Sequence, residues 1–283
     1  MIVRKTEAEL ELMARAGRVV AELHEVLREA VRPGISTAEL DEIAEREVRS
    51  RGAVPSFKGY RGFPATLCTS VNAEIVHGIP SPDVVLREGD LLKIDAGAIV
   101  DGYHGDSAVT WVVGGSAPQE VLDLVERTRA GLWAGLAQAT PGNRLTDISA
   151  AVESWALPYG YGVVREYVGH GIGRALHEDP HVPNYGRPGR GPRLVGGLVL
   201  AVEPMFNLGG AETQLLDDDW PVVTADGSLA AHWEHTVAIT EDGPWVLTAR
   251  SDEPARPLAE PVHSVVGTTV PLNGLGIDAG GGQ

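Results

Sequence analysis

Four acidic residues end or follow apolar, strand-like segments that recur along the chain. Segment 89–95 ends in an aspartate, and segment 197–203, which has a similar pattern of glycine and apolar residues, ends in a glutamate 108 positions later. A second acid follows each segment. A duplicated half-domain would bring the four carboxylates together, where they would repel one another and raise each other's pKa unless cations lay between them. The acids are Asp95, Asp106, Glu203 and Glu234.

The first two acids flank a predicted hairpin. The pair Asp101-Gly102 lies between apolar stretches, and Asp-Gly favours a two-residue hairpin loop. In that register Gly97 faces Asp106 and residue 95 faces residue 108. The two acids then share one face as diagonal neighbours, roughly 7–8 Å apart at Cα. Taken alone, an exposed hairpin that carries acids explains the pattern at least as well.

Three histidines favour a metal site over an exposed acidic hairpin. His170 lies in the segment GHGIG (169–173), where three glycines allow the backbone to approach a ligand closely. His177 begins the segment HEDP (177–180), and His77 lies in VHGIP (76–80). Each histidine alone is more often a satisfied polar residue. Beside four paired carboxylates, however, they favour divalent ions such as Mn, Fe, Co or Zn, and two ions about 3.5–4 Å apart are an arrangement used for hydrolysis.

The elements that must position these residues follow the same order twice. Capping boxes that begin at Thr6 and Ser36 predict helices to about residues 29 and 51. The second half predicts helices at about 118–138 and 146–157. Pro33-Gly34 and Pro141-Gly142, also 108 positions apart, separate the helices of each pair.

Strand-like stretches follow each helix pair, so each half combines two helices with an antiparallel sheet. This is an α+β pattern. The second half has about 20 extra residues between its acids, expected as a loop around 207–219. Strands are expected near 65–71, 90–99 and 103–113, and then near 163–167, 198–202, 220–224, 232–239 and 245–248.

Composition limits the class of protein. With 283 residues, 43% of them hydrophobic, the chain can form one domain of two halves, about 1–115 and 116–250. Residues 251–283 are expected to form a flexible tail without a catalytic role. A net charge of −16 disfavours binding to nucleic acid or to anionic membranes. One cysteine, and neither a signal peptide nor a membrane span in the sequence, predict a cytoplasmic protein.

These motifs together resemble those of the type I methionine aminopeptidases, from about residue 4 to residue 250. The resemblance implies the pseudo-twofold "pita-bread" fold, which agrees with the repeat. It also implies a monomer that removes the initiator methionine of nascent chains, possibly at the ribosome, when the second residue is small. The matching segments are SVNAEIVHGIP (70–80), IDAG (94–97), HGD (104–106), GHGIG (169–173), VEPM (202–205) and EHT (234–236).

The resemblance also implies two divalent ions (Co, Mn, Fe, Zn or Ni) and a role for each ligand. One ion would be held by Asp95, Asp106 and Glu234, and the other by Asp106, His170, Glu203 and Glu234. A bridging hydroxide would attack the first peptide bond. Glu203 would move the proton, while His77 and His177 would contact the substrate and stabilise the tetrahedral intermediate. The methionine pocket would be lined by Tyr60, Phe63, Cys68, Leu176, Met205 and Trp220.

Alternatives remain on the sequence alone. Leu176 departs from the family pattern, in which an aromatic residue is common at this place. Each residue assigned to the methionine pocket could instead be an ordinary residue of the hydrophobic core. Another pita-bread peptidase, such as a prolidase, would carry a large additional N-terminal domain, whereas here the first helix begins near residue 7. A low-activity paralogue that acts mainly as a binding module is the other alternative.

Overall fold

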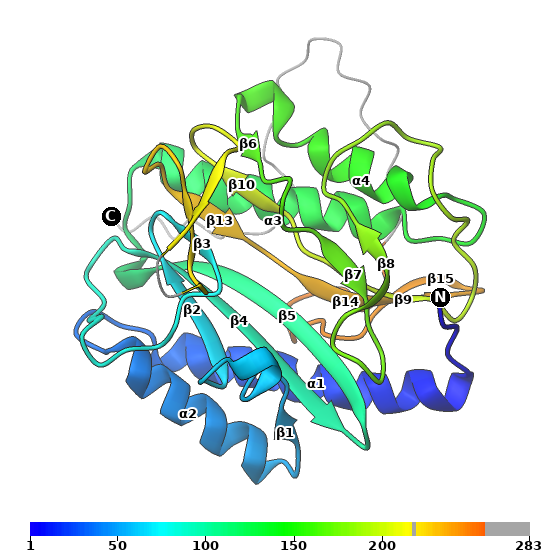
Figure 1. The fold of residues 1–283 in the computed structure, drawn as a ribbon, viewed down its shortest axis with the longest axis horizontal. Helices are drawn as coiled ribbons and strands as arrows, with labels where there is room; N and C mark the ends of the chain where they lie inside the picture. The colour runs from blue at the N-terminus through cyan, green and yellow to red at the C-terminus, as the bar shows by residue number, and fades with distance from the viewer. Residues whose placement is uncertain (217–218, 258–283) are drawn as a thin grey trace, which may run out of the picture.

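Two pairs of helices enclose the strands that carry the four acids (Figure 1). The structure, a computed structural model, describes residues 1–216 and 219–257. Helices α1 (Glu7–Ala30) and α2 (Thr37–Ser50) lie on one side, and α3 (Gln119–Ala137) and α4 (Leu145–Glu153) on the other. The α+β fold class predicted from the sequence is confirmed.

The first two helices begin where their capping boxes predict. Thr6 and Ser36 accept the backbone N–H of Glu9 and Glu39, whose carboxylates accept the cap N–H in return. The fourth helix is shorter than predicted, because it ends at residue 153 rather than 157. Pro158 has no N–H to continue the α-helical hydrogen bonds, and the chain instead forms a 3-10 turn at Leu157–Tyr159.

Two larger sheets carry the acids, and two three-stranded sheets complete the fold. The first larger sheet contains β1 (Val54–Pro55), β2 (Leu67–Val71), β4 (Leu91–Val100) and β5 (Tyr103–Val112). The second contains β7 (Gly169–Gly171), β8 (Glu178–Val182), β9 (Val199–Val202), β14 (His235–Thr240) and β15 (Gly243–Val246). The smaller sheets contain β6 (Gly162–Val163), β10 (Met205–Asn207) and β13 (Ala230–His232), and β3 (Glu74–Val76), β11 (Thr213–Leu215) and β12 (Val222–Thr224).

The predicted hairpin has the predicted register. In the β4–β5 ladder Gly97 is opposite Asp106, and residue 95 is opposite residue 108. The loop residues Asp101 and Gly102 both have positive φ, at 50° and 80°. These values fit the type I′ turn that Asp-Gly favours. The turn chemistry therefore sets which face of the sheet receives the two acids.

The duplication appears as hydrogen bonds that recur 108 positions apart. The N–H of Gly34 donates to the carbonyl of Leu86, and that of Gly142 donates to the carbonyl of Leu194. Both glycines have positive φ, 89° and 96°, which glycine adopts without strain. Each helix pair is thus tied to its strands in the same way. The same offset relates two isolated bridges, Ser36–Val85 and Arg144–Arg193.

Several strand predictions need correction in the second half. The stretch 163–167 contributes only the two-residue β6. The stretch 232–239 is divided into β13 and β14, because Trp233 and Glu234 break the ladder. The extra residues around 207–219 contain β11 rather than a plain loop. These departures occur where the chain bends to bring side chains into one site.

The expected tail is described only to residue 257, and residues 258–283 lie outside the described part of the chain. Before that point the side chain of Glu253 is fully buried. The segment after residue 250 therefore packs on the body of the protein at least to Glu253.

The two halves join along a seam between β5 and residues 234–236. The hydroxyl of Thr236 donates to the carbonyl of Asp106 and accepts from its N–H, at 2.8 and 3.1 Å. Ser107 Oγ donates to the carbonyl of Glu234 at 2.8 Å. Hydroxyl side chains therefore fix the backbones that carry two of the four acids relative to each other.

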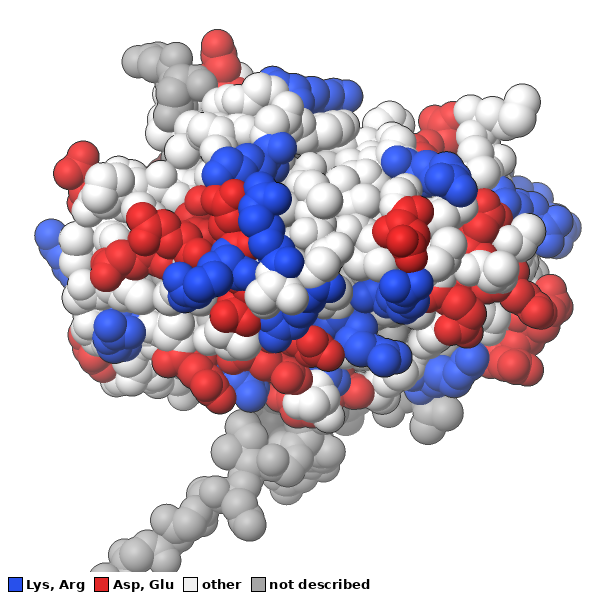
Figure 2. All heavy atoms as spheres, turned by 90° about the horizontal axis from the view of Figure 1, so that it is seen from below, with Lys and Arg blue, Asp and Glu red and all other residues white. Residues whose placement is uncertain are grey.

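One face of the molecule is mixed in charge despite the acidic composition. Lys and Arg are interspersed with Asp and Glu on the face seen from below in Figure 2. Among the described residues, no helix is both long enough and apolar enough to cross a membrane.

Close packing of α1 on the strands leads to a stability prediction. A Cβ added at Gly17 would lie 2.3 Å from the carbonyl oxygen of Leu247. We therefore expect Gly17→Ala to lower the free energy of unfolding by about 1–3 kcal/mol, measured by urea denaturation. In an unobstructed helix the same change stabilises by about 0.4–1 kcal/mol. The exposed Glu11→Ala on the same helix is the control, and a Gly17→Ala protein as stable as wild type would contradict the prediction.

Candidate active site

The four acids converge because each lies within or next to a central strand. Asp95 is in β4 and Asp106 in β5, whereas Glu203 follows β9 and Glu234 precedes β14. In the β9–β14 ladder residue 202 pairs with residue 235, so the two glutamates lie side by side just beyond it. The seam then brings this pair to the aspartate hairpin.

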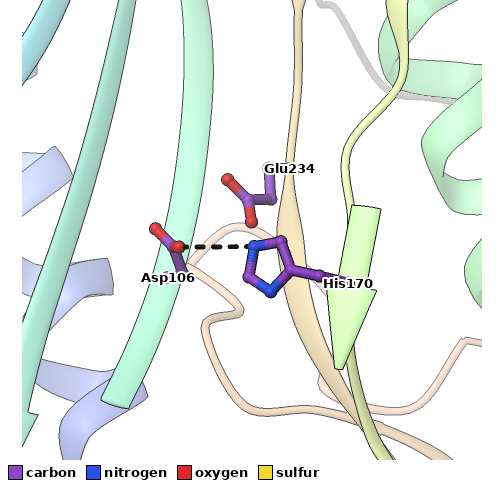
Figure 3. A group of neighbouring side chains, drawn as sticks. All are labelled: Asp106, His170 and Glu234. Carbon is purple, nitrogen blue, oxygen red and sulfur yellow. Dashed lines mark ion pairs between the residues drawn. The ribbon is translucent and has the colours of Figure 1, made fainter. Parts of the chain in front are cut away.

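His170 completes the cluster. One ligand atom each from Asp106, His170 and Glu234 lies within 4.8 Å of the others, and all three side chains are buried (Figure 3). His170 Nε2 is 3.6 Å from Glu203 Oε1 and 4.0 Å from Asp106 Oδ2. Asp95 lies close enough to raise the pKa of Asp106 by charge repulsion. The five residues expected as ligands therefore lie in one place.

The tautomer of His170 is set by the backbone. Its Nδ1 is 2.8 Å from the carbonyl oxygen of Gly171, an acceptor only, so Nδ1 carries the proton. Burial lowers the pKa of this imidazole to about 3, which keeps it neutral. The Nε2 lone pair therefore faces the carboxylates, as a metal ligand requires.

The acids are strongly perturbed by their surroundings. Burial raises the pKa of Asp95 to about 7 and that of Glu203 to about 8. Burial, followed by repulsion from neighbouring carboxylates, raises the pKa of Asp106 and Glu234 well above the usual range. Such shifts are typical of acids that a cation stabilises when it binds.

Orphaned oxygens show that this donor set fits a metal. Asp95 Oδ1, Asp106 Oδ1 and Glu234 Oε1 are buried and have no hydrogen-bond partner among the described residues. Buried acceptors are normally satisfied, by protein, water or an ion. Several carboxylates and one neutral imidazole form an oxygen-rich set that suits divalent ions of hard or borderline type.

Of the two histidines expected to contact substrate, His177 lies beside His170 and His77 lies against Tyr167 and Trp220. The His177 ring lies 4.2 Å from that of His170, stacks on Tyr60, and its Nδ1 is 2.9 Å from the Tyr60 hydroxyl. His77 has φ of 62°, rare for a residue with a Cβ. Its ring meets the edge of Trp220 at 6.5 Å. Burial lowers the pKa of both imidazoles, that of His77 to about 4.

Most residues expected in the methionine pocket belong to one apolar cluster beside the acids. Phe63 and Trp220 meet edge to face at 5.0 Å. Cys68 is buried, and burial followed by repulsion from Asp95 raises its thiol pKa, so it is apolar in character rather than a nucleophile. Met205 is the exception, because it packs in a separate cluster. The members of the first cluster are Tyr60, Phe63, Cys68, Leu176 and Trp220.

Sequence inspection missed two buried histidines at this site. His232 Nε2 is 3.6 Å from Glu203 Oε2, and burial lowers the pKa of this imidazole to about 4. His104 Nδ1 is 3.0 Å from the hydroxyl of Ser56. The one sequence feature that they share is a place two residues before a candidate ligand, which within β5 puts His104 on the same face as Asp106.

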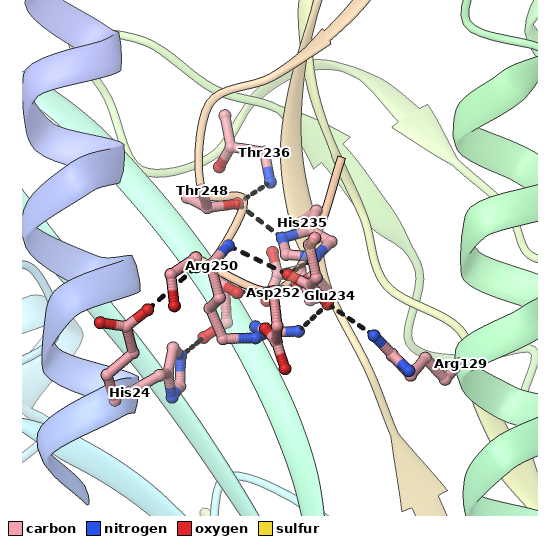
Figure 4. A network of polar contacts seen from close by, with 12 residues as sticks. His24, Arg129, Glu234, His235, Thr236, Thr248, Arg250 and Asp252 are labelled. Atoms are coloured by element: carbon pink, nitrogen blue, oxygen red, sulfur yellow. Dashed lines mark hydrogen bonds and ion pairs between the residues drawn. The ribbon is translucent and has the colours of Figure 1, made fainter. Parts of the chain in front are cut away.

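A buried charged network supports the site from behind (Figure 4). His235 follows Glu234 and points the other way, with Nδ1 2.8 Å from the hydroxyl of Thr248 and Nε2 3.2 Å from Glu253 Oε2. Arg250 donates to the same carboxylate at 2.5 Å. This network anchors His235, the first residue of β14, and thereby the backbone next to Glu234.

The acid cluster predicts an unusual pH dependence for metal-free protein. Acids whose pKa is raised on folding stabilise the fold below pH 4, and this contribution is lost as pH rises towards 8. We expect the melting temperature of metal-free protein to fall between pH 5 and pH 8, and added Mn²⁺ to raise it more at pH 8. Asp95→Asn should reduce the fall, and the loss in free energy of unfolding over this pH range should be smaller by on the order of 2 kcal/mol. The exposed Asp83→Asn should change neither. Equal slopes for both variants would disprove the assignment.

The chain is similar to known proteins. The model of metallopeptidase family M24 matches residues 11–241. A methionine aminopeptidase of Clostridium acetobutylicum is 52% identical over 248 residues, which cover 88% of this chain and 99% of that protein. Methionine aminopeptidase 1 of Bacillus subtilis is 53% identical, with the same coverage.

The fold agrees with these relatives. The crystal structure of a methionine aminopeptidase from Thermotoga maritima matches with a TM-score of 0.86 and 41% identity, covering 88% of this chain and 100% of that one. This match confirms the pita-bread arrangement. The chain therefore belongs to metallopeptidase family M24, within the group of methionine aminopeptidases.

Proposed function

We propose that this protein removes the N-terminal methionine from peptides and nascent chains whose second residue is small. One observation carries the proposal: a buried cluster of four acids and a neutral imidazole lies beside an aromatic, apolar cluster. The first is suited to hydrolysis and the second to an unbranched apolar side chain. The identity of about half the residues with methionine aminopeptidases favours this function over that of a prolidase.

We assign five residues as ligands of two divalent ions. Asp95, Asp106 and Glu234 would hold one, and Asp106, His170, Glu203 and Glu234 the other. Such ions supply a Lewis acid that polarises a carbonyl and lowers the pKa of water towards ~7. The donor set accommodates Co, Mn, Fe, Zn or Ni, among which availability in the cell decides.

The protein's own groups then guide the substrate and move the proton. Glu203, whose metal-free pKa is raised to about 8, is suited to take up a proton and pass it to the leaving amine. His77 and His177, whose imidazole pKa values burial lowers, would donate to the oxyanion of the tetrahedral intermediate. The His177 ring lies 4.2 Å from that of His170. Tyr60 fixes the His177 ring by stacking and by its hydroxyl contact.

The methionine side chain is proposed to lie against Phe63, Trp220, Cys68 and Leu176. Met205 fits this role less well, because it is fully buried in the neighbouring cluster. We further propose that the protein acts as a monomer in the cytoplasm, on chains that emerge from the ribosome. The lone, buried cysteine and the acidic composition are compatible with that setting.

A peptide panel tests the activity. Metal-loaded protein should release methionine from Met-Ala-Ser and Met-Gly-Met-Met, but spare peptides with a bulky second residue. Exhaustive chelation should abolish release, and His170→Ala should lower kcat/KM by roughly 100-fold or more, because it removes a ligand. The exposed His181→Ala serves as control. Steady turnover after chelation would refute the metal mechanism, and cleavage of Xaa-Pro dipeptides without release of methionine would favour a prolidase.

The pocket assignment has its own test. Phe63→Ala removes the ring that meets Trp220, and should lower kcat/KM for methionyl peptides by about 10–100-fold. Metal affinity, measured by calorimetry, should not change. Tyr159→Ala, which removes an exposed aromatic ring elsewhere, is the matched control. Unchanged kinetics for Phe63→Ala would place the methionine side chain somewhere else.

A further inference from the structure

His232 is a buried imidazole inside the site to which no role has been assigned. Its side chain is 1% exposed, and neither ring nitrogen has a hydrogen-bond partner among the described residues. A buried polar group without a partner costs about 1–3 kcal/mol. The nearest candidate partner is the carboxylate of Glu203, with Oε2 3.6 Å from Nε2.

The backbone of His232 is held firmly in this position. Thr110 Oγ1 donates to the carbonyl of His232 at 2.6 Å and accepts from its N–H at 2.9 Å. On the other side His232 pairs with Met205 in the β10–β13 ladder. Because strand pairing fixes the direction of the Cβ, the ring stays directed at the site.

Glu203 thus lies between two imidazoles of different chemistry. Its Oε1 faces His170 and its Oε2 faces His232, each at 3.6 Å. His170 uses its Nδ1 proton on a backbone carbonyl, which leaves a lone pair on Nε2. No backbone acceptor fixes the tautomer of His232 within the described residues, so the carboxylate oxygen of Glu203 that faces its Nε2 is the group that can determine where the proton lies.

We propose that His232 is a positioning residue for Glu203, with its Nε2–H donating to Glu203 Oε2. This inference rests on the function proposed above. With the present 3.6 Å gap closed, this hydrogen bond would fix one carboxylate oxygen and keep the other directed at His170, where it could bind a metal. Partners of ligating groups orient those ligands and strengthen metal binding in this way.

The tautomer can be observed directly. In zinc-loaded protein labelled with ¹⁵N-histidine, the ring nitrogens of His232 are assigned by their loss in His232→Gln. We expect a protonated Nε2 and an unprotonated Nδ1, the reverse of His170. A proton on Nδ1 of His232 would overturn the proposal. This measurement uses the wild-type ring and does not depend on how well a variant folds.

Two substitutions separate hydrogen bonding from shape. His232→Leu removes the donor, and should lower kcat by about 10–100-fold with KM within about twofold. Its affinity for Mn²⁺, measured by calorimetry, should weaken by a similar factor. His232→Gln keeps an N–H donor and should stay within about fivefold of wild type in both quantities. His181→Leu, an exposed imidazole cross-strand from His170, is the matched control.

The outcomes distinguish this inference from the proposed function. If wild type releases methionine and His232→Leu matches it in kcat and Mn²⁺ affinity, the positioning role fails alone. A Gln variant as impaired as the Leu variant, both with wild-type melting temperature, would also reject the donor role. If wild type releases no methionine but His232→Leu still weakens Mn²⁺ binding, the proposed function fails and the role in positioning Glu203 survives.

Discussion

Mutual repulsion among four buried carboxylates is the constraint on which this structure depends. Taking a carboxylate from water into an apolar interior is costly, and placing others beside it adds to the cost. The fold must therefore hold the acids in place against a force that separates them. It does so with regular strands rather than loops, since Asp95 and Asp106 lie within a ladder and the two glutamates lie directly at the end of another.

Hydrogen bonds along the seam between the halves hold the acids together against this repulsion. Ordinary strand pairing gives way there to bonds from hydroxyl side chains, as when Thr236 both donates to and accepts from the backbone of Asp106. Such two-way bonds satisfy backbone groups that a bent strand leaves unpaired. Behind the seam, the buried carboxylate of Glu253 draws together His235 and Arg250. The residues proposed as metal ligands are thus supported by a buried network of charged side chains.

Much of this arrangement could be predicted from the sequence because it is local or repeated. The Asp101-Gly102 turn sets the register of the first acid pair, and capping boxes set two helix starts. The repeat at an offset of 108 residues then predicted that the second half contributes a corresponding pair of acids. Prediction was wrong where tertiary contacts override local pattern. At the break, the N–H groups of Trp233 and Glu234 donate to the carbonyls of Pro204 and Ala108, which are distant in sequence. The strand β11 forms against β12, which itself pairs with the distant β3.

Buried polar side chains were the other kind of omission. His232 and Glu253 sit in unremarkable sequence contexts, and only their burial and partners reveal a role. A lone histidine or a glutamate near the end of a chain is most often solvated, so pattern alone gives no reason to select it. Their importance follows from geometry that a sequence does not display.

The imidazoles also explain how a duplicated frame can perform a directional reaction. The acids are related in pairs by the repeat, Asp95 with Glu203 and Asp106 with Glu234, and a fully symmetric site would give a proton no preferred path. Both imidazoles that face Glu203 come from the second half, and position 62, the counterpart of His170, is a glycine. Glu203 is also longer than Asp95 by one methylene, which lets it reach between them. The duplication provides four acids in a nearly symmetric cluster suited to cations. The two histidines beside Glu203 make this acid different from Asp95, its counterpart in the first half.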